Sequence, residues 1–304
     1  MALLALVLVN LVFGATFVVV KDAMTHVAPV RFLALRFLVA GPLLLVAAAL
    51  FQRSALAHAA TWRDGALLGA LLFVSYALQT TGLVFTTPAV SAFLTALSVP
   101  MIPLLGLWFL GERVNAITWF GVATAAAGLV ALTLPGHVAP GPGEALTVLT
   151  AIGFAVHIVL TARMARRTPP LPLVAVQLVV AGVLALLALP LDGWLAARGA
   201  TGAPAAALLA PLPPIAWLEV VGMGLGATAL TFFLQTWAQR RLSATRAGVT
   251  FALEPVFATV FSLAFFAERI GLRAAAGMLL ILAGMLVVEV LGHREPALAG
   301  PGPG

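Results

Sequence analysis

The sequence predicts an all-α membrane protein in which ten transmembrane helices form two inverted five-helix repeats. Of its 304 residues, 62% are hydrophobic and 9% are charged, and the mean hydropathy is +1.14. Soluble domains are about half apolar and about a quarter charged. Apolar runs recur along nearly the whole chain, each close to the ~20 residues that cross a ~30 Å hydrocarbon layer as a helix. Polar and glycine positions of the first half recur in the second half. A water-soluble fold has no place for such runs.

Breaks at charges, prolines and glycines divide the chain into ten predicted spans. The first run lacks the positive segment of a secretory signal, because its first basic residue is Lys21, so we expect it to remain as a helix. The ten spans are residues 3–21, 29–50, 65–84, 88–110, 114–134, 144–164, 172–192, 214–238, 246–267 and 270–291.

Basic residues in the short loops predict the orientation, because cytoplasmic loops carry an excess of Lys and Arg. With the N-terminus inside, ten lie on the inner side: Arg53, Arg63, Arg113, Arg163, Arg166, Arg167, Arg240, Arg241, Arg246 and Arg294. Five lie on the outer side: Lys21, Arg31, Arg198, Arg269 and Arg273. We therefore expect a multi-pass protein of the cell inner membrane with both termini in the cytoplasm.

The internal repeat is the most informative feature of the sequence. Shifted by 141 positions, "PVRFLALRFLVAGPLLLVA" aligns with "PPLPLVAVQLVVAGVLALLA". Shifted by 156 positions, "LWFLGERVNAITWFGVATAAAG" aligns with "LAFFAERIGLRAAAGMLLILAG", so that Glu112 meets Glu268 and Gly128 meets Gly284. The predicted division is residues 1–135 for the first repeat, 136–143 for a connecting loop, 144–292 for the second repeat and 293–304 for a disordered tail.

Each predicted repeat holds five spans, an odd number, so the second repeat enters the membrane from the opposite side. Inverted repeats can pack in two alternative ways around one central site, which is the physical basis of alternating access. The sequence therefore favours a carrier.

Several motifs resemble one known family. They are the paired "LGER" (110–113) and "AER" (267–269), "LEPVFA" (253–258), "FGATFVVVK" (13–21) and "ALRFLVAG" (34–41). Together they look like the EamA-type members of the drug/metabolite transporter superfamily, and the resemblance covers essentially the whole chain. Within that superfamily the chain is most similar to amino-acid exporters, including those for aromatic residues and methionine. The resemblance thus implies export of amino acids, with apolar or aromatic ones preferred. Another small metabolite or a drug is the alternative cargo.

Glu254 lies inside an otherwise apolar span. Acidic residues within spans usually face a cavity or a partner, because a charge near the middle of the membrane is costly. Pro255 cannot donate a backbone hydrogen bond and so frees the carbonyl of Phe251. Burial favours the protonated carboxyl, the property that a proton carrier needs. Glu254 is therefore a candidate for the substrate ammonium or for coupling. The alternative is a structural contact with neighbouring polar groups, and the first repeat has Ser98 at this position.

Two spans present an aromatic ring and an amide together. Tyr76, Gln79 and Thr80 lie at i, i+3 and i+4, hence on one helical face, and Phe232 and Gln235 repeat the spacing in the second half. Such a pair suits the apolar and polar ends of an amphipathic metabolite. The alternative is hydrogen bonding between helices, worth about 1 kcal/mol.

The remaining site candidates lie in the first, fourth and sixth spans. Ser91, Thr95 and Ser98 share one face, although small hydroxyl residues also serve helix packing. His157 and Thr161 share another face, and His157 is the only histidine within a predicted span. The first span offers Asn10, Phe13 and Phe17 as cavity-lining residues.

Other polar and glycine positions have mainly structural interpretations. Lys21 and Arg36 lie toward the outer ends of their helices, where long side chains reach water, and Arg36 is also a weaker candidate for substrate contact. We interpret Glu112–Arg113 and Glu268–Arg269 as structural pairs. The glycine pairs Gly222/Gly226, Gly121/Gly128 and Gly277/Gly284 predict close helix packing within the chain or, alternatively, between protomers.

Other functions fit the sequence poorly. The aspartates fall at span ends, and neither G-x-S-x-G nor H-E-x-x-H is present, so we expect no enzyme, metal or cofactor. A channel is opposed by the lack of charge rings or a carbonyl filter signature. The scattered basic residues indicate topology rather than nucleic-acid binding. We expect the partners to be a small-molecule substrate and the lipid bilayer, and the chain to be a monomer, with a dimer as the alternative.

Overall fold

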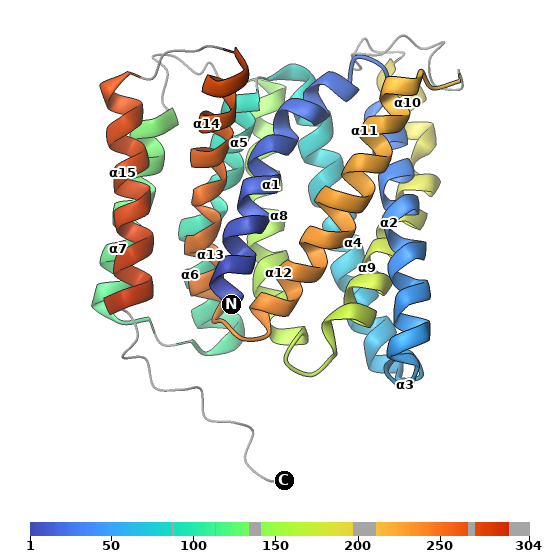
Figure 1. Cartoon of the computed structure of the whole chain (residues 1–304), viewed down its shortest axis with the longest axis horizontal. Coiled ribbons are helices and arrows are strands. Elements are labelled where there is room, and N and C mark those ends of the chain that lie inside the picture. The colour runs from blue at the N-terminus through green and yellow to red at the C-terminus, as the bar shows by residue number, and fades with distance from the viewer. Residues whose placement is uncertain (87, 113, 134–140, 197–210, 267–270, 292–304) are drawn as a thin grey trace.

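The computed structural model describes residues 1–86, 88–112, 114–133, 141–196, 211–266 and 271–291. Within these ranges every regular element is a helix, and the long helices stand side by side in one bundle (Figure 1). In chain order they are α1 Ala2–Ala23, α2 Pro29–Phe51, α3 Arg53–Leu56, α4 Ala59–Phe85, α5 Pro88–Ala96, α6 Ser98–Leu110, α7 Ala116–Thr133, α8 Pro142–Met164, α9 Pro170–Leu187, α10 Leu189–Ala196, α11 Pro214–Gly224, η2 Leu225–Leu230, α12 Thr231–Gln239, α13 Ala244–Phe251, α14 Leu253–Phe266, α15 Leu272–Leu286 and η3 Val287–Leu291.

Seven helical segments of the described chain are long and apolar enough to cross a membrane. Two shorter apolar helices, Ala116–Ala131 and Ala275–Leu286, accompany them. The predicted all-α membrane class is confirmed, whereas the ten spans and their inverted arrangement stay predictions. The seven segments are Ala2–Ala23, Pro29–Phe51, Ala59–Phe85, Val90–Leu110, Pro142–Met164, Pro170–Leu187 and Pro214–Gln239.

The third predicted span starts too late. We expected it to begin at Gly65, after two charges, but α4 begins at Ala59. Asp64 is buried inside the helix because Arg167 donates to both of its carboxylate oxygens, at 2.7 and 2.8 Å. An ion pair with a residue far along the chain makes a buried charge acceptable, and a local reading of the sequence does not reveal it.

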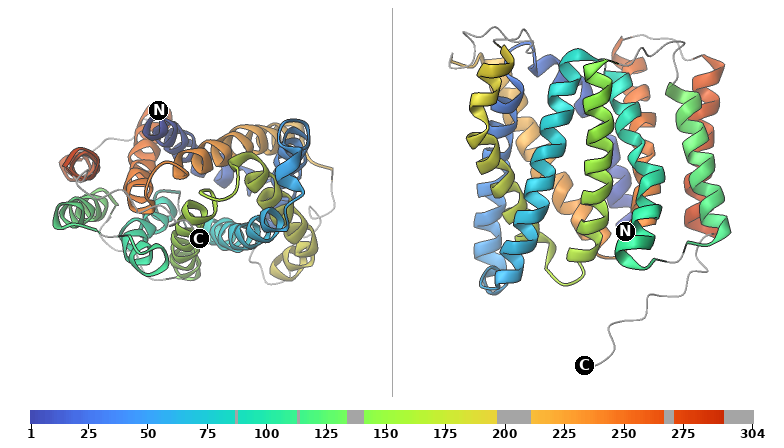
Figure 2. Two further views of the ribbon diagram at one scale, coloured as in Figure 1. Left: turned by 90° about the horizontal axis from the view of Figure 1, so that it is seen from below. Right: turned by 180° about the vertical axis from the view of Figure 1, so that it is seen from behind.

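The bundle is held by helix pairs from different parts of the chain. α2 packs along α9, α4 lies against α8 and α9, and α7 packs along α15. The α7–α15 pair stands at one edge of the bundle in both views of Figure 2. The glycines explain the close α7–α15 contact, because a Cβ atom on Gly128 would lie 2.7 Å from the carbonyl oxygen of Gly277. The packing predicted for these glycines is confirmed.

Gly284→Ala is expected to destabilise the protein by about 1–3 kcal/mol, the usual range for overpacking. A Cβ atom at this position would lie 2.5 Å from the carbonyl oxygen of Gly121 and 2.6 Å from the amide nitrogen of Ala125, and backbone atoms yield only if the helices separate. The measurement is thermal unfolding in detergent. Gly222→Ala is the control, because nothing lies within 4 Å of its added Cβ. Equal melting temperatures for the two variants would contradict the packing argument.

The prediction for the pair Gly222 and Gly226 within the chain is wrong. An added Cβ at either glycine meets no atom within 4 Å among the described residues. The reason is that α11 and η2 turn this face away from close helix contact, as the neighbouring Leu218 and Leu225 are 70% and 43% exposed. Spacing alone does not say which side of a helix meets a partner.

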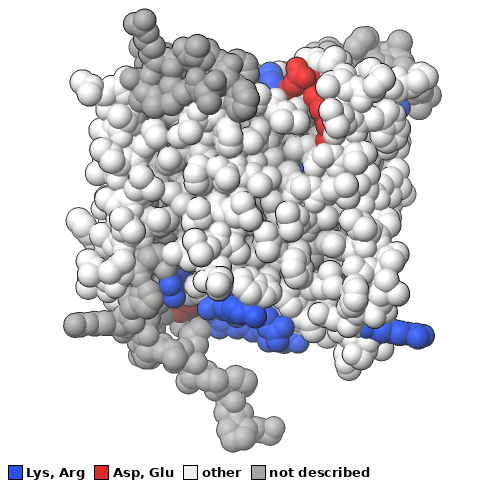
Figure 3. All heavy atoms as spheres, viewed as in Figure 1, with Lys and Arg blue, Asp and Glu red and all other residues white. Residues whose placement is uncertain are grey.

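Charged residues gather at the two ends of the bundle. On the face shown in Figure 3, most visible basic atoms lie along the lower edge and most acidic atoms at the upper edge. The N-terminus lies at the lower end in Figure 1. The tail 293–304 and positions 136–140 lie outside the described residues. So do five residues used for the charge count or the repeat: Arg113, Arg198, Glu268, Arg269 and Arg294.

Glu112 joins the two halves of the chain at the lower end. Its carboxylate accepts from the backbone N–H groups of Ala244 and Thr245, at 2.8 and 3.3 Å, and from the Thr245 hydroxyl at 2.9 Å. These N–H groups begin α13 and have no partner within their own helix. The contact agrees with the structural interpretation of Glu112.

Glu112→Ala is expected to lower the free energy of unfolding by roughly 2–3 kcal/mol, because three hydrogen bonds to a buried carboxylate are lost. Arg166→Ala is the matched control. Its guanidinium lies 3.9 Å from the same carboxylate and is 38% exposed, so its loss should have little effect. Denaturation in detergent gives both values. Similar losses would mean that the ion pair, rather than the helix cap, holds the corner.

Candidate functional site

A cavity lies inside the bundle where both halves of the chain meet. It offers about 70 Å³ to the centres of water-sized molecules, and one water needs about 10–15 Å³. About half of the lining residues are apolar or aromatic and the others are polar or charged, a combination that suits a ligand with apolar and polar ends. The lining residues are Phe13, Thr16, Phe17, Val20, Arg36, Tyr76, Gln79, Thr80, Leu83, Thr95, Ala96, Ser98, Phe154, His157, Ile158, Phe232, Gln235, Phe251 and Glu254.

Two broken helices meet this cavity. α5 gives way to α6 at Leu97, and α13 gives way to α14 at Ala252. Proline three residues beyond each break supplies the reason, since Pro100 and Pro255 have no N–H to offer the carbonyl four residues earlier. At both breaks the backbone makes a tighter bond instead, from Leu97 to Leu94 at 3.2 Å and from Ala252 to Val249 at 3.1 Å.

The breaks lie within one residue of matching places in the sequence repeat, because the shift of 156 takes Leu97 to Leu253, next to Ala252. The same shift relates Ser98 to Glu254. Both residues line the cavity. Irregular backbone inside a membrane is tolerated where it borders a cavity. The prolines therefore place two local interruptions at the same chamber.

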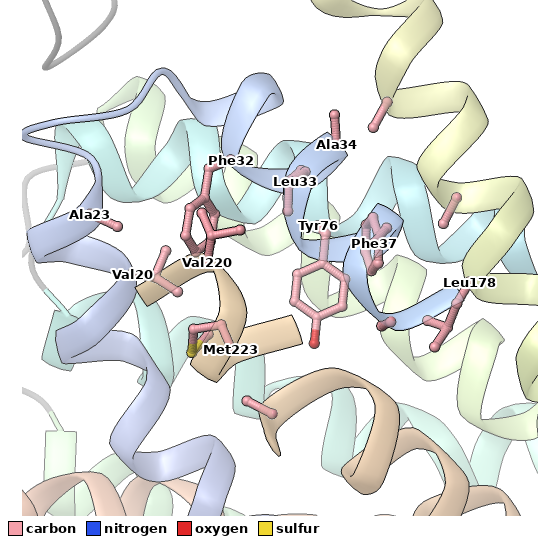
Figure 4. Close-up of a cluster of buried hydrophobic side chains, with 14 of the residues drawn as sticks. Val20, Ala23, Phe32, Leu33, Ala34, Phe37, Tyr76, Leu178, Val220 and Met223 are labelled. Atoms are coloured by element: carbon pink, nitrogen blue, oxygen red, sulfur yellow. The ribbon is translucent and has the colours of Figure 1, made fainter. Parts of the chain in front are cut away.

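Aromatic rings form much of the wall. Tyr76 lies 5.1 Å from Phe154 and 6.2 Å from Phe232, and Phe13 lies 6.0 Å from Phe232, measured between ring centroids. Figure 4 shows the Tyr76 ring, from α4, among the side chains of α2 and α11 that form the neighbouring apolar cluster. These tilted and edge-on contacts favour a rigid wall.

Arg36 is the cation of the cavity. It is 2% exposed, its Nε donates to the hydroxyl of Thr228, and its Nη2 donates to the carbonyl of Ala227 at 3.0 Å. Its guanidinium lies over the Tyr76 ring, 4.8 Å from the centroid. In the described ranges of the chain no acid forms an ion pair with it. The buried charge is held by neutral groups alone.

The anchor of Arg36 coincides with a change of helix type. Ala227 and Thr228 belong to η2, a π-helical segment between α11 and α12. A π-helical turn shifts the backbone carbonyls out of register with the α-helix, and such turns occur frequently at functional sites. Here it turns the carbonyl of Ala227 toward the guanidinium.

Glu254 is the acid of the cavity. It is the second residue of α14, in the first turn after the break, and borders the chamber with a partly exposed side chain. The three ion pairs found among the described residues involve Asp64 and Glu112, and no described residue makes a hydrogen bond to the Glu254 carboxylate. One cavity thus contains a cation and an acid that do not neutralise one another directly.

The structure brings ten of the twelve predicted site residues to this cavity: Phe13, Phe17, Tyr76, Gln79, Thr80, Thr95, His157, Phe232, Gln235 and Glu254. Gln79 also donates to the Thr95 hydroxyl at 3.1 Å, so the alternative of a hydrogen bond between helices is real for this pair. Among the lining residues that we did not predict, Phe154 lies at i−3 from His157, and Phe251 is the residue whose carbonyl Pro255 frees. Both signals were present in the sequence.

Asn10 and Ser91 are not among the lining residues. Asn10 is fully buried, and its amide donates back to the carbonyl of Leu6 at 2.6 Å in its own helix. Ser91 is also fully buried, and its hydroxyl has no partner among the described residues. Both positions lie on faces of their helices that pack against the protein.

Polar side chains continue behind the cavity wall. His157 and Gln235 line the chamber, while Gln177 and Thr161 lie deeper, with 0% exposure. The Gln177 amide lies beside the His157 ring, yet neither amide atom meets the geometry of a hydrogen bond with any described residue. An unpaired buried polar group destabilises the fold by about 1–3 kcal/mol.

Comparison with known proteins identifies the family. The model of the EamA-like transporter family matches residues 1–134 and 141–290. The chain belongs to the EamA-like transporter family. It is also similar to an uncharacterized transporter from Archaeoglobus fulgidus, with 27% identity over 290 residues that cover 94% of this chain and 85% of that protein. A solved crystal structure, 22% identical, covers 96% of this chain and 99% of its own with a TM-score of 0.76 and so has the same fold.

Membership fixes the coarse function. EamA-like proteins are transporters of the drug/metabolite transporter superfamily, and this chain is a multi-pass membrane protein of that transporter family. The chamber described above is a cavity of this EamA-like protein that polar groups from both halves line.

Proposed function

We propose that this EamA-like transporter exports amino acids, with apolar or aromatic ones preferred, across the inner membrane. The observation that supports the substrate class is the pair Arg36 and Glu254 in one aromatic chamber, neither of them in an ion pair with a described residue. A zwitterion supplies a carboxylate for the guanidinium and an ammonium for the carboxylate. The rings of Phe13, Tyr76 and Phe232 then receive an apolar side chain.

Charge balance favours this assignment over a simple ion. Transferring a charged group from water into an apolar site is costly unless it is paired. A zwitterion pairs both chamber charges at once, whereas a lone amine or a lone acid pairs one of them. The guanidinium also suits a carboxylate, because its planar fork presents parallel N–H donors.

The proposed mechanism is alternating access between two inverted five-helix repeats, residues 1–135 and 144–292. The sequence repeat supports it, and so do the matching breaks at Leu97 and Ala252. Broken helices around a central site are typical of carriers built this way. The chamber has room for several waters but is smaller than the ~300–1,000 Å³ of most ligand pockets, so a whole amino acid enters only when the helices part. The excess of basic residues on the side of the N-terminus supports cytoplasmic termini.

Reconstituted counterflow tests the proposal. Phenylalanine is the tracer, and the competitors are apolar amino acids, phenethylamine, phenylpropionate, a nucleoside and a sugar. We expect amino acids to compete at least about tenfold better than either the amine or the acid, because each of the latter loses one charged contact worth about 1.5–3 kcal/mol. Inhibition by the sugar alone would refute an amino-acid substrate. Competition by cationic drugs without amino acids would favour a drug exporter, and unsaturable flux without counterflow would indicate a channel.

A further inference from the structure

A second group of polar side chains extends from the chamber toward the lower end of the bundle. It begins at two lining residues and continues through four residues that do not line the chamber, all from α8, α9 and α12. We call this group the polar branch: His157, Thr161, Gln177, Gln235, Thr236 and Gln239. Every member is at most 3% exposed.

Helical spacing aligns the members into stripes that face a common interior. Thr161 follows His157 by one turn of α8, and Gln235, Thr236 and Gln239 follow Phe232 at the i+3, i+4 and i+7 positions of α12. The stripes are tied together, because the Gln239 amide donates to the carbonyl of Ile158 at 3.2 Å. Elements α8 and α9 both pack against α12.

Most of the branch has no protein partner. Five buried atoms lack a hydrogen bond to any described residue: His157 Nε2, Thr161 Oγ1, Gln177 Nε2, Gln177 Oε1 and Thr236 Oγ1. Both amide atoms of Gln177 are in this group, so a donor and an acceptor lie side by side. Buried polar groups nearly always find partners, with ordered water supplying them where protein does not. The concentration of unpaired atoms in one place indicates a common ligand with both donors and acceptors.

The polar branch runs from the chamber toward one end of the bundle. The chain runs along α12 from the chamber at Gln235 to Gln239, the last residue of that helix, and Arg240 beyond it is exposed. Thr161 likewise lies between the chamber residue His157 and the end of α8 at Met164. The branch therefore connects the chamber with the end of the bundle where most visible basic atoms gather (Figure 3).

We propose that the polar branch binds a chain of water molecules and forms the inner, hydrated arm of the transport pathway, between α8, α9 and α12. Water is small enough for such a narrow site and can both donate to and accept from these groups. The hydrated arm provides a polar path between the chamber and the lower end of the bundle. It concerns the transporter's route and does not depend on which substrate is carried.

Infrared spectroscopy of single thiols tests the hydration. The sequence has no cysteine, so an introduced thiol gives the only S–H band. Thr161→Cys and Thr236→Cys place it in the branch. The matched controls Ala162→Cys and Ala238→Cys place it one or two residues away, on fully buried apolar positions of the same helices. The purified protein is transferred to D₂O without substrate, and the conversion of S–H to S–D is followed.

We expect the branch thiols to exchange at least about tenfold faster than the control thiols, because exchange requires water at the sulfur. Equal rates at branch and control positions would overturn the proposal. No substrate is added to any sample, so the outcome is independent of the amino-acid assignment.

A second variant is expected to change the melting temperature in opposite directions for a dry and for a hydrated branch. Gln177→Met removes both unpaired amide atoms at similar side-chain length. In a dry branch, removing unpaired polar atoms raises the melting temperature. In a hydrated branch the apolar side chain displaces water and leaves Thr161 and Thr236 without partners, so we expect the melting temperature to fall by several degrees. An increase would overturn the proposal even if the cysteine variants failed to fold.

Discussion

Replacing Arg36 with methionine is expected to weaken amino-acid binding by tenfold to about 150-fold. This range corresponds to the about 1.5–3 kcal/mol of a hydrogen bond to a charged group, at about 1.4 kcal/mol for each tenfold change in Kd. The side chain is the cation of the chamber and has no acid partner among the described residues. Its loss removes the proposed contact to the substrate carboxylate while the aromatic wall remains.

Substrate analogues make this result specific. Binding of phenethylamine, which has no carboxylate, should weaken much less in Arg36→Met than binding of phenylalanine. Arg36→Lys is the second variant, because it keeps the charge but loses the planar fork that also holds Thr228 and Ala227. We expect its affinity for phenylalanine to lie between those of the wild type and Arg36→Met. If binding of the amine and of the amino acid weakens equally, Arg36 supports the chamber structurally through α11–α12 and does not bind the carboxylate.

Glu254→Gln is expected to weaken amino-acid binding over the same range, through loss of the ammonium contact. The substitution keeps the shape of the side chain, so the chamber and the break at Ala252 should persist. Affinity is measured by counterflow, which requires no driving gradient, and proton-coupled uptake is measured in parallel. The deaminated analogue phenylpropionate should lose little affinity.

Glu219→Gln is the matched control. Glu219 is also an acid within an apolar helix and is 9% exposed, but it borders a groove between α1 and α11 rather than the chamber. We expect wild-type counterflow from it. Wild-type counterflow from Glu254→Gln together with lost proton-coupled uptake would assign Glu254 to proton carriage instead of ammonium binding. Unchanged behaviour in both assays would leave it a structural residue.

Helical spacing grouped several candidates on one face, and their role as a binding site stays a prediction. Tyr76, Gln79 and Thr80 were placed together because i, i+3 and i+4 point the same way, and all three line the chamber. Single polar residues were harder to interpret. Asn10 is satisfied in part by its own helix, and no local pattern separates such a residue from one that faces a cavity.

Arg36 shows that a contact between distant parts of the chain is not predicted by a local pattern. Its position near a helix end favoured a side chain that reaches water, and no local pattern indicated the π-helical turn that anchors it from the other half of the chain. Asp64 is similar, because its partner Arg167 is distant in the sequence. In both cases a long-range contact decides whether a charge is buried.

By itself the sequence determined that the chain is an all-helical membrane protein, because long apolar runs cannot be solvated in water, and that Pro255 would free a backbone carbonyl within a span, because it lacks an N–H. Its motifs also determined the family. Only the tertiary structure decided that Arg36 of α2 and Glu254 of α14 share one chamber and that Gly222 of α11 and Gly226 of η2 meet no close helix partner among the described residues. The physical reason is that the period of a helix fixes which residues share a face, whereas the packing of whole helices fixes what each face meets.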